Sequence, residues 1–483
     1  MQDTSVREQG RVVIAGARGF IGALLTRSMP FRWKVIALSR SISKATEGSV
    51  EYRQCELVNW EETRRAVDQS EYAVYLVHSM MPAARLSQGR FEDFDLLSAA
   101  HFARACAAAG VKQIVYLGGL MPQGYARGLA ERDTAAAQAP LSSHLESRME
   151  VEKVLGAYGV PLTTLRAGLI LGAGGSSSEM LIRLVERLPV LLCPSWTSNQ
   201  TQPIAAQDVV RLLQFCIGNP ATFNQTFDIG GIETVTYRQM MKKTSLALDK
   251  RRRFYKIPIF APTLSRLWVS LVTGAPRRLV YPLIESLRYT MIPENLRLQD
   301  MAGVTTTNFN TLISSTLQDR QQSSISPRAF IGQKGVHERK VLSVQRLPLP
   351  PHWNAKRVVE EYRKWLPRVF LGMIRVSDHE AEGFEIFLRP FAKPVLGLHA
   401  LPSTSPDSQE FEIASGWLAR RSTAQPGILE FLAIPSSSAV IVSIHNYQPR
   451  LPWVFYLFTQ AIAHAWVMSA FGRYLARRGG DLK

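Results

Sequence analysis

Three glycines near the N-terminus have the types and spacing needed to bind a phosphate group. Gly16, Gly19 and Gly22 follow the apolar run Val12–Ala15 and open a helical stretch, so a strand turns directly into a helix. At such a turn the first glycine permits the bend, the second lets a pyrophosphate approach the backbone, and the third allows close helix packing. The free N–H groups of the helix then face the phosphates. The pattern predicts a dinucleotide site.

The end of the next predicted strand bears on which dinucleotide binds. An acidic residue there would bond the ribose 2′-hydroxyl of NAD and repel the 2′-phosphate of NADP. Instead, Val35–Leu38 is followed by Ser39 and Arg40. Arg18, inside the glycine loop, is a second cation for the same phosphate, and a planar guanidinium suits that role. We therefore expect NADP. The alternative is NAD, with both arginines merely solvated.

Short β-branched apolar runs alternate with helical stretches through this part of the chain. Such runs are typical of parallel strands buried on both faces. The predicted strands are Val12–Ala15, Val35–Leu38, Ala73–Val77, Ile114–Leu117 and Thr163–Leu171, with helical spacing over Phe91–Ala109. The expected fold class is α/β, with a doubly wound parallel Rossmann sheet.

These features resemble the atypical branch of the short-chain dehydrogenase/reductase superfamily, which is nucleoside-diphosphate-sugar-epimerase-like and NmrA-like. Glu56-Leu57 resembles the adenine-contacting turn, although the family usually has Asp before Leu; Tyr75–His78 resembles the strand that passes the cofactor's ribose. Arg166–Gly172 and Phe227–Gly231 resemble later strands. The resemblance, with the glycine loop, implies a cofactor site formed by Gly16, Arg18, Gly19, Phe20, Ile21, Gly22, Ser39, Arg40, Glu56, Leu57 and His78.

The chain departs from the family at the residues that usually carry the chemistry. Typical members place Ser or Thr after the fifth strand and a Tyr-x-x-x-Lys pair on the next helix. Here Gly118-Gly119 ends that strand, and His144 and Arg148 stand at the Tyr and Lys positions. Histidine serves as a general acid near neutral pH, whereas arginine stays protonated and holds a hydroxyl or an anion. We take both as candidate catalytic residues; the alternative is a helix surface without a role.

Two functions from different classes fit this combination. The first is an NADP-dependent oxidoreductase or epimerase-like enzyme that acts on a hydrophobic carbonyl or a quinone-like substrate. The second is a non-catalytic NADP-binding regulator or assembly protein, which explains the missing triad directly. Loss of the triad does not exclude catalysis, because the hydride chemistry belongs to the cofactor and the protein must chiefly position the substrate.

Composition narrows the classes of partner. Lys and Arg number 57 against 39 Asp and Glu, a net charge of +18, which favours anionic partners. The basic residues are scattered and lack RNA-module motifs, so nucleic acid is not expected. The four cysteines stand far apart without metal-ligand spacing, so we expect buried thiols, a reducing compartment and no metal. The N-terminus lacks a signal-peptide pattern, so the expected location is cytoplasmic.

Length predicts at least two domains. We place the Rossmann domain with its substrate lobe at residues 8–313, a polar linker at 314–335, and a C-terminal α+β domain at 336–483. In the last domain the expected order is a strand (Val336–Leu347), a helix (Trp353–Leu366), several strands and a long helix near Pro452–Ala476. That order resembles the START-like helix-grip arrangement, an antiparallel sheet gripping a long helix. Its interior would be either a cavity for a hydrophobic ligand or a filled core.

The strands expected between those helices are Val369–Val376, Phe384–Leu388, Phe411–Leu418, Ile428–Ile434 and Val440–His445. The segment Trp453–Ala470 is apolar on nearly every face, which leaves two interpretations: a buried helix, or a short membrane span. Gln460 and His464 within it favour the buried helix. The basic surface and the aromatic segment Leu264–Tyr289 add a further expectation, association with a membrane surface such as the inner membrane.

Overall fold

The computed structural model describes residues 10–41, 46–78, 86–122, 141–257, 269–322, 341–379, 383–403, 405–420, 426–435 and 437–480. The chain divides into two compact units. The first takes in residues 1–81 and 101–332, and the second takes in residues 82–100 and 333–483. Each unit is built on an eight-stranded sheet.

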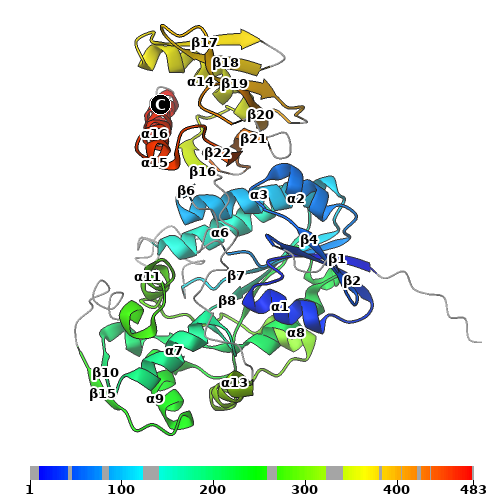
Figure 1. Ribbon diagram of the computed structural model, residues 1–483. Coiled ribbons are helices and arrows are strands. Elements are labelled where there is room, and N and C mark those ends of the chain that lie inside the picture. Colours follow the sequence, from blue (N-terminus) through cyan, green and yellow to red (C-terminus); the bar gives the residue numbers. More distant parts are fainter. Residues whose placement is uncertain are drawn as a thin grey trace, which may run out of the picture. The chain divides into compact units, whose positions relative to one another are not determined.

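The sheet of the first unit has the order β13-β8-β7-β5-β1-β2-β4-β3, and all its pairs are parallel except that of β3 with β4 (Figure 1). Its strands are β1 (Gly10–Ala15), β2 (Trp33–Ser39), β3 (Thr46–Glu47), β4 (Val50–Gln54), β5 (Tyr72–Tyr75), β7 (Gln113–Gly119), β8 (Leu162–Ala167) and β13 (Thr226–Ile229). The doubly wound parallel fold is thereby confirmed.

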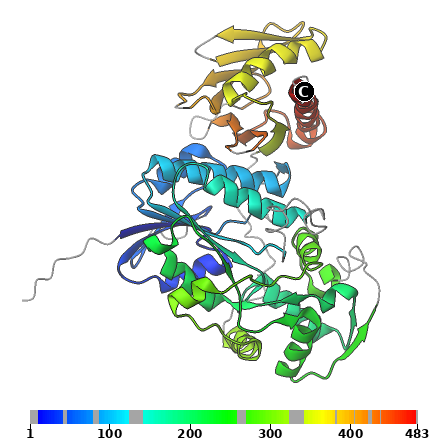
Figure 2. The same cartoon turned by 180° about the vertical axis from the view of Figure 1, so that it is seen from behind.

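Helices cover both faces of this sheet (Figures 1 and 2). The helices of the whole first unit are α1 (Phe20–Ser28), α2 (Trp60–Val67), α3 (Phe91–Ala108), α6 (Ser143–Leu155), α7 (Ser176–Arg187), α8 (Ala206–Cys216), α9 (Tyr237–Ala247), α11 (Arg277–Ser286), α12 (Arg297–Ala302) and α13 (Phe309–Gln322). Of these, α7, α9, α11 and α13 pack with one another beside the sheet rather than on it. Leu25 of α1 and Val209 of α8 pack on Val12 and Ile14, which are fully buried. This two-sided cover explains why the strands are apolar without alternation.

Two details of the first unit differ from the sequence prediction. The run Thr163–Leu171 is two strands, because β8 ends at Ala167 and β9 (Ile170–Leu171) pairs instead with β12 (Ile204–Ala205). The predicted linker 314–335 begins inside α13, where Leu317 is buried with Phe309 and Leu312, so 314–322 is helix. Helical spacing of those apolar residues outweighs the polar composition. Residues 323–340 lie outside the described part.

The predicted boundary of the Rossmann domain also needs correction within residues 82–100. The strand β6 (Leu86–Gln88) pairs in parallel with Val341–Ser343 of β16 (Val341–Pro348) and so adds an edge strand to the second unit. In the same unit, Arg346 of β16 forms an ion pair with Asp93, 2.8 Å apart. The N-terminal segment therefore contributes structure to the unit that the C-terminal segment builds.

The second unit is an antiparallel sheet of order β17-β18-β19-β20-β21-β22-β16, extended by the parallel β6. Its further elements are α14 (Ala355–Val369), β17 (Ile374–His379), β18 (Gly383–Leu388), β19 (Pro394–Ala400), β20 (Ser408–Ser415), β21 (Gly427–Ala433), β22 (Ala439–Tyr447), α15 (Trp453–Phe458) and α16 (Gln460–Gly480). The predicted antiparallel α+β architecture is confirmed.

Helix and strand limits in this unit depart from expectation in three places. The run Val369–Val376 is not one strand, since α14 continues to Val369 and β17 starts at Ile374. The strand β19 was not predicted. The expected long helix is interrupted at Thr459 into α15 and α16. Within the described residues, no helix combines the length and the apolar composition that crossing a bilayer requires.

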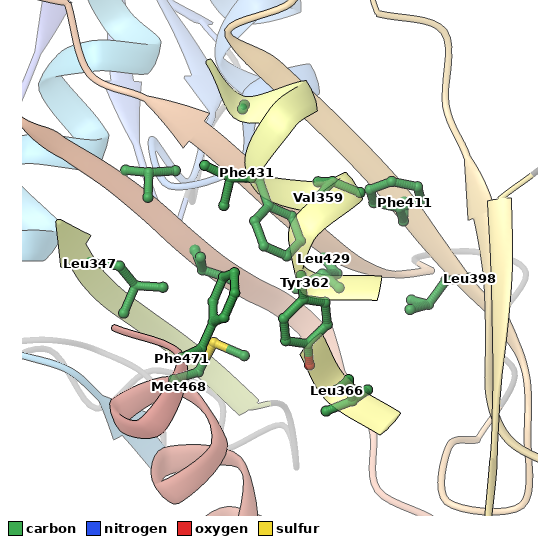
Figure 3. Packing of buried hydrophobic residues seen from close by; sticks show 14 of the residues in the cluster. Leu347, Val359, Tyr362, Leu366, Leu398, Phe411, Leu429, Phe431, Met468 and Phe471 are labelled. Atoms are coloured by element: carbon green, nitrogen blue, oxygen red, sulfur yellow. The ribbon is translucent and has the colours of Figure 1, made fainter. Parts of the chain in front are cut away.

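Aromatic side chains fill the space between the helices and the sheet of the second unit (Figure 3). Phe471 of α16 is fully buried, and its ring centroid lies 5.1 Å from that of Tyr362 and 5.0 Å from that of Trp365, both on α14. Tyr362 also packs 5.8 Å from Phe431 of β21. Truncating such a ring to alanine typically costs about 3–5 kcal/mol. These contacts join α14, α16 and the sheet into one core.

A half-buried histidine of α16, His464, should make the unit sensitive to acid. Burial lowers the pKa of His464 to about 4, below its ordinary value of 6.5. The unfolded chain therefore binds this proton first, and stability falls as the pH drops from about 6.5 toward 4. A His464→Gln variant should lose less stability over that interval, by ~2–3 kcal/mol at pH 4. Urea unfolding at pH 7 and pH 4 measures the free energy of unfolding of both proteins. An equal loss of stability in the wild type and in His464→Gln would contradict the prediction.

Candidate functional site

The glycine loop lies between β1 and α1 and has the geometry that its spacing predicted. Gly16 has φ +83°, in the left-handed region, and a Cβ there would lie 2.9 Å from the Leu76 carbonyl oxygen. A Cβ on Gly22 would lie 2.1 Å from the carbonyl oxygen of Gly16, so only glycine allows α1 to pack this closely. Gly16 and Gly22 thus have structural roles.

Gly19 has a different environment from the other two glycines. It is exposed, it precedes the first residue of α1, and its N–H donates to the Gly16 carbonyl oxygen at 2.8 Å. A Cβ there would meet only that oxygen within 4 Å, at 3.1 Å, and would otherwise project into open space. The backbone is therefore open to a ligand at the N-terminus of α1, where the helix dipole favours an anion.

Phe20 and Ile21, both predicted to belong to the cofactor site, direct their side chains elsewhere. The Phe20 ring packs so closely on Gly172 and Gly175 that a Cβ on either would lie 3.1 or 2.8 Å from it. Ile21 is buried in the sheet core. The predicted contribution of these two residues is thus limited to their backbone groups in the first turn of α1.

The cationic residues predicted for a 2′-phosphate lie beside the end of β2. Arg40 is exposed directly after Ser39, whose hydroxyl donates to the carbonyl oxygen of Ser41 at 2.8 Å. Arg18 extends from the glycine loop over the ring of Tyr52 on β4, 5.7 Å from its centroid. Since β2 lies between β1 and β4 in the sheet, both guanidinium groups are on the β2 side of the loop.

The predicted adenine turn follows β4. Burial raises the pKa of the Glu56 carboxyl, and the charge of Arg40 partly opposes that change. The Glu56 N–H donates to the carboxylate of Glu62 at 2.9 Å, and Asn59 caps α2. Leu57 is buried and its carbonyl oxygen lies 3.0 Å from Nδ1 of His101. The turn is therefore held by its own hydrogen bonds.

The structure brings the three remaining predicted residues together. His78 lies beyond the carboxyl end of β5, and His144 and Arg148 lie in the first two turns of α6. The rings of His78 and His144 are 5.0 Å apart, and the Arg148 guanidinium contacts Nδ1 of His78 and the Val77 carbonyl oxygen, the latter at 3.4 Å. Because arginine only donates, Nδ1 of His78 accepts, which places the proton of a neutral ring on Nε2.

Two residues of β7 position Arg148. The hydroxyl of Tyr116, which the sequence analysis did not name, donates to the Arg148 carbonyl oxygen at 3.3 Å and thereby ties α6 to the sheet. A Cβ on Gly119 would lie 3.2 Å from Cγ of Arg148. The glycine at the usual serine position therefore makes room for the longer arginine. The replacement of both the family's serine, by Gly119, and its lysine, by Arg148, is the sequence signal that could have indicated this contact.

An apolar cluster adjoins this group of polar residues. Leu120 and Met121 follow β7, Leu145 is next to His144, and they pack with Leu141 and Met291. All five are buried. A Cβ on Gly119 would meet both Arg148 and Leu145, at 3.2 and 3.7 Å, so the apolar cluster borders the polar group at Arg148.

The loop and its surroundings fit a nicotinamide dinucleotide. The accessible backbone at Gly19 and the N-terminus of α1 would hold the pyrophosphate, and Arg18 and Arg40 would be the cations for a phosphate of the adenosine half. Among the described residues, no group of three His, Cys, Asp or Glu side chains is placed to hold a metal ion. All four cysteines are buried, and burial raises the pKa of Cys55 to about 12, so its thiol stays protonated.

Sequence comparison agrees with this class of site. Residues 12–230 match the model of the family described as NAD dependent epimerase/dehydratase. The N-terminal part of the chain thus has the sequence pattern of an NAD(P)-binding protein of the epimerase and short-chain dehydrogenase type. Both the geometry of the glycine loop and this family match support a nicotinamide cofactor.

Two curated relatives match parts of the chain. The auxiliary protein GraX of Staphylococcus aureus is 29% identical over 121 residues, 25% of this chain and 39% of that protein. The UDP-glucose 4-epimerase of Vibrio cholerae is 23% identical over 176 residues, 35% of this chain and 54% of that protein. The chain thus spans about two fifths and about half of their lengths in these matches.

Solved structures resemble the fold at low identity. A nucleoside-diphosphate-sugar epimerase of Staphylococcus aureus matches with a TM-score of 0.48 and 15% identity, over 63% of this chain and 99% of that one. An NADPH-dependent quinone oxidoreductase of Escherichia coli, complexed with NADPH, matches with a TM-score of 0.48 and 17% identity, over 63% and 98%.

Proposed function

We propose that the first unit is an NADP(H)-dependent reductase that acts on the carbonyl of a hydrophobic or quinone-like substrate. The observation that carries this proposal is the group of His78, His144 and Arg148 beside the carboxyl ends of β5 and β7, bordered by apolar side chains. In open α/β sheets, ligands bind at the carboxyl ends of the strands. The group therefore lies on the side of the sheet where the glycine loop would hold the cofactor.

Each residue of the group has a distinct role in this proposal. A reduced nicotinamide supplies the hydride. His144 donates a proton to the carbonyl oxygen, a role that suits imidazole near neutral pH. Arg148 holds an anionic oxygen or a ribose hydroxyl, and His78, fixed by Arg148 at Nδ1, presents its Nε2–H. The apolar neighbours exclude water from the reacting atoms.

The proposal is tested by mixing the protein with NADPH and a panel of hydrophobic aldehydes, ketones and quinones. We expect consumption of NADPH, followed by its absorbance, with at least one member of the panel. Tight NADPH binding without any consumption would overturn the reductase and favour the regulator described below. If turnover persists in both His144→Ala and His78→Ala, the two histidines have no catalytic role, but the protein is still a reductase.

A second proposal concerns the choice of NADP over NAD. Arg18 and Arg40 supply two cations near the end of β2. An Arg40→Ala variant should bind NADPH about 10-fold more weakly and NADH unchanged, because one charge-assisted hydrogen bond is lost. Fluorescence titration with both cofactors measures it. Arg32→Ala, an exposed arginine on the same unit, is the control.

Equal loss of affinity for both cofactors in Arg40→Ala would show that the arginine acts on the fold. No loss for either cofactor would mean that Arg40 is only a solvated surface residue, and NAD would then be the favoured cofactor.

A non-catalytic NADP-binding regulator remains the second candidate. Two observations favour it: Gly119, His144 and Arg148 stand where the family has its catalytic residues, and one curated relative is named an auxiliary protein. In that case the three residues would serve only to hold the cofactor.

The second unit supports a proposal of its own. The element order β16, α14, then β17 to β22, then α16, with β16 pairing with β22, is what a START-like helix-grip domain would have.

A further inference from the structure

A set of apolar side chains on the second unit is exposed to solvent. They belong to α15, to the first half of α16 and to the turn that follows α14. Their exposed fractions run from 47% for Trp466 to 93% for Leu371. We call the apolar tip the set Leu371, Met373, Phe455, Phe458, Ile462 and Trp466. Apolar residues gathered in this way mark an interaction surface.

The two parts of the apolar tip are joined by a direct contact. The ring of Trp466 packs edge-on against that of Phe370, with centroids 5.6 Å apart, and Phe370 directly precedes Leu371. On α16, Ile462 and Trp466 are one helical turn apart and therefore share a face. Arg473 and Arg477 continue the same face at helical spacing and are exposed. One helix face is thus apolar at its start and cationic at its end.

The segments that carry the apolar tip are cationic, although the carboxylate of Glu361 on α14 accepts a hydrogen bond from Tyr474 of α16 at 2.9 Å and Asp378 lies just beyond one of them. The segments 364–377 and 447–480, which carry all its residues, contain seven Lys and Arg and no Asp or Glu. The cations are Lys364, Arg368, Arg375, Arg450, Arg473, Arg477 and Arg478. Arg368 and Arg375 flank Leu371 and Met373 on both sides and are exposed. This charge is complementary to an anionic partner.

The backbone at Leu371 has a conformation that is uncommon for leucine. Leu371 has φ +48°, in the left-handed region that favours glycine at the end of a helix. The residue after it is Gly372, with φ +77° and an N–H that donates to the Pro367 carbonyl oxygen at 2.9 Å. A leucine in this conformation, 93% exposed, adds little to the packing of the unit, which points to a role outside it.

We propose that the apolar tip docks on an anionic lipid surface. Leucine, phenylalanine and tryptophan would enter the boundary between headgroups and acyl chains, while the surrounding arginines contact lipid phosphates. A second copy of the chain fits less well, because a symmetric contact would bring these arginines together without a carboxylate. The segment Leu264–Tyr289, which the sequence also suggested for a membrane surface, belongs to the first unit, and its residues 264–268 lie outside the described part.

Sedimentation of the full chain with vesicles tests the docking. Binding to vesicles that contain phosphatidylglycerol should be at least ~10-fold tighter than to phosphatidylcholine alone, and should weaken with salt. The double variant Leu371→Ser, Ile462→Ser should bind ~10-fold or more weakly, and Arg473→Gln with Arg477→Gln should reduce the salt dependence. Phe31→Ser, equally exposed on the first unit, should bind like the wild type.

A glycine variant separates the proposed role from a structural one. Leu371→Gly relieves the left-handed backbone and should raise the melting temperature while it weakens vesicle binding. The proposal is overturned if the wild type binds both kinds of vesicle equally or neither, or if the serine variants bind like the wild type. It is also overturned if sedimentation velocity shows a dimer that Leu371→Ser dissociates.

Discussion

A Gly19→Ala variant should fold normally and bind NADPH about 100-fold more weakly. A Cβ at this position meets only the Gly16 carbonyl oxygen, at 3.1 Å, and its φ of −69° suits alanine, so the fold has little reason to change. The methyl group would instead occupy the space through which the pyrophosphate approaches the N-terminus of α1. Fluorescence titration with NADPH, beside thermal unfolding, measures both effects.

Two further glycines provide the matched comparison. Gly22→Ala places its Cβ 2.1 Å from a backbone oxygen, so it should lower stability as well as affinity. Gly156→Ala, at φ −85° with an ordinary 3.4 Å contact, should alter neither. If Gly19→Ala bound NADPH like the wild type, the glycine loop would not be the phosphate site. If it unfolded, its role would be structural.

His144→Ala should lower kcat for carbonyl reduction about 100-fold, the size expected when a general acid is removed. The affinity for NADPH should stay within a factor of about 3, since the glycine loop is unchanged. Arg148→Lys should reduce both kcat and NADPH affinity. A lysine cannot reproduce the guanidinium geometry that contacts Val77 and His78 together.

His399→Ala, an exposed histidine on the second unit, is the control and should keep full activity. The pH profile gives a second readout, because loss of a histidine acid should remove the decline of kcat above neutral pH. If His144→Ala kept the wild-type kcat and pH profile, the proton would come from another group or from water.

Local patterns were sufficient to predict the cofactor loop and the fold class. The spacing of Gly16, Gly19 and Gly22 after an apolar strand has one steric interpretation, and the structure has that geometry. Buried parallel strands can be predicted in the same way, because each one is apolar on both faces. The predicted boundaries were wrong where polar composition indicated a linker but the spacing of the apolar residues indicated a helix, as at residues 314–322 of α13.

Contacts between distant segments were not predictable from composition or spacing. The Tyr116 hydroxyl meets a backbone oxygen of α6, and the strand Leu86–Gln88 pairs with β16, far along the chain. Both depend on tertiary placement, and the sequence carries no periodic signal for either. The contact of His78 with Arg148 was not predicted either, because it joins the end of β5 to a helix that follows another strand, β7.

Transfer of deuterium from NADPH labelled at C4 of the nicotinamide tests the central claim most directly. Each hydrophobic carbonyl of the panel is incubated with the protein and the labelled cofactor, and the product is analysed by mass spectrometry. We predict one deuterium in the reduced product of at least one substrate, formed about 100-fold more slowly by His144→Ala. NADPH that binds tightly yet transfers deuterium to no member of the panel would contradict the proposed reductase.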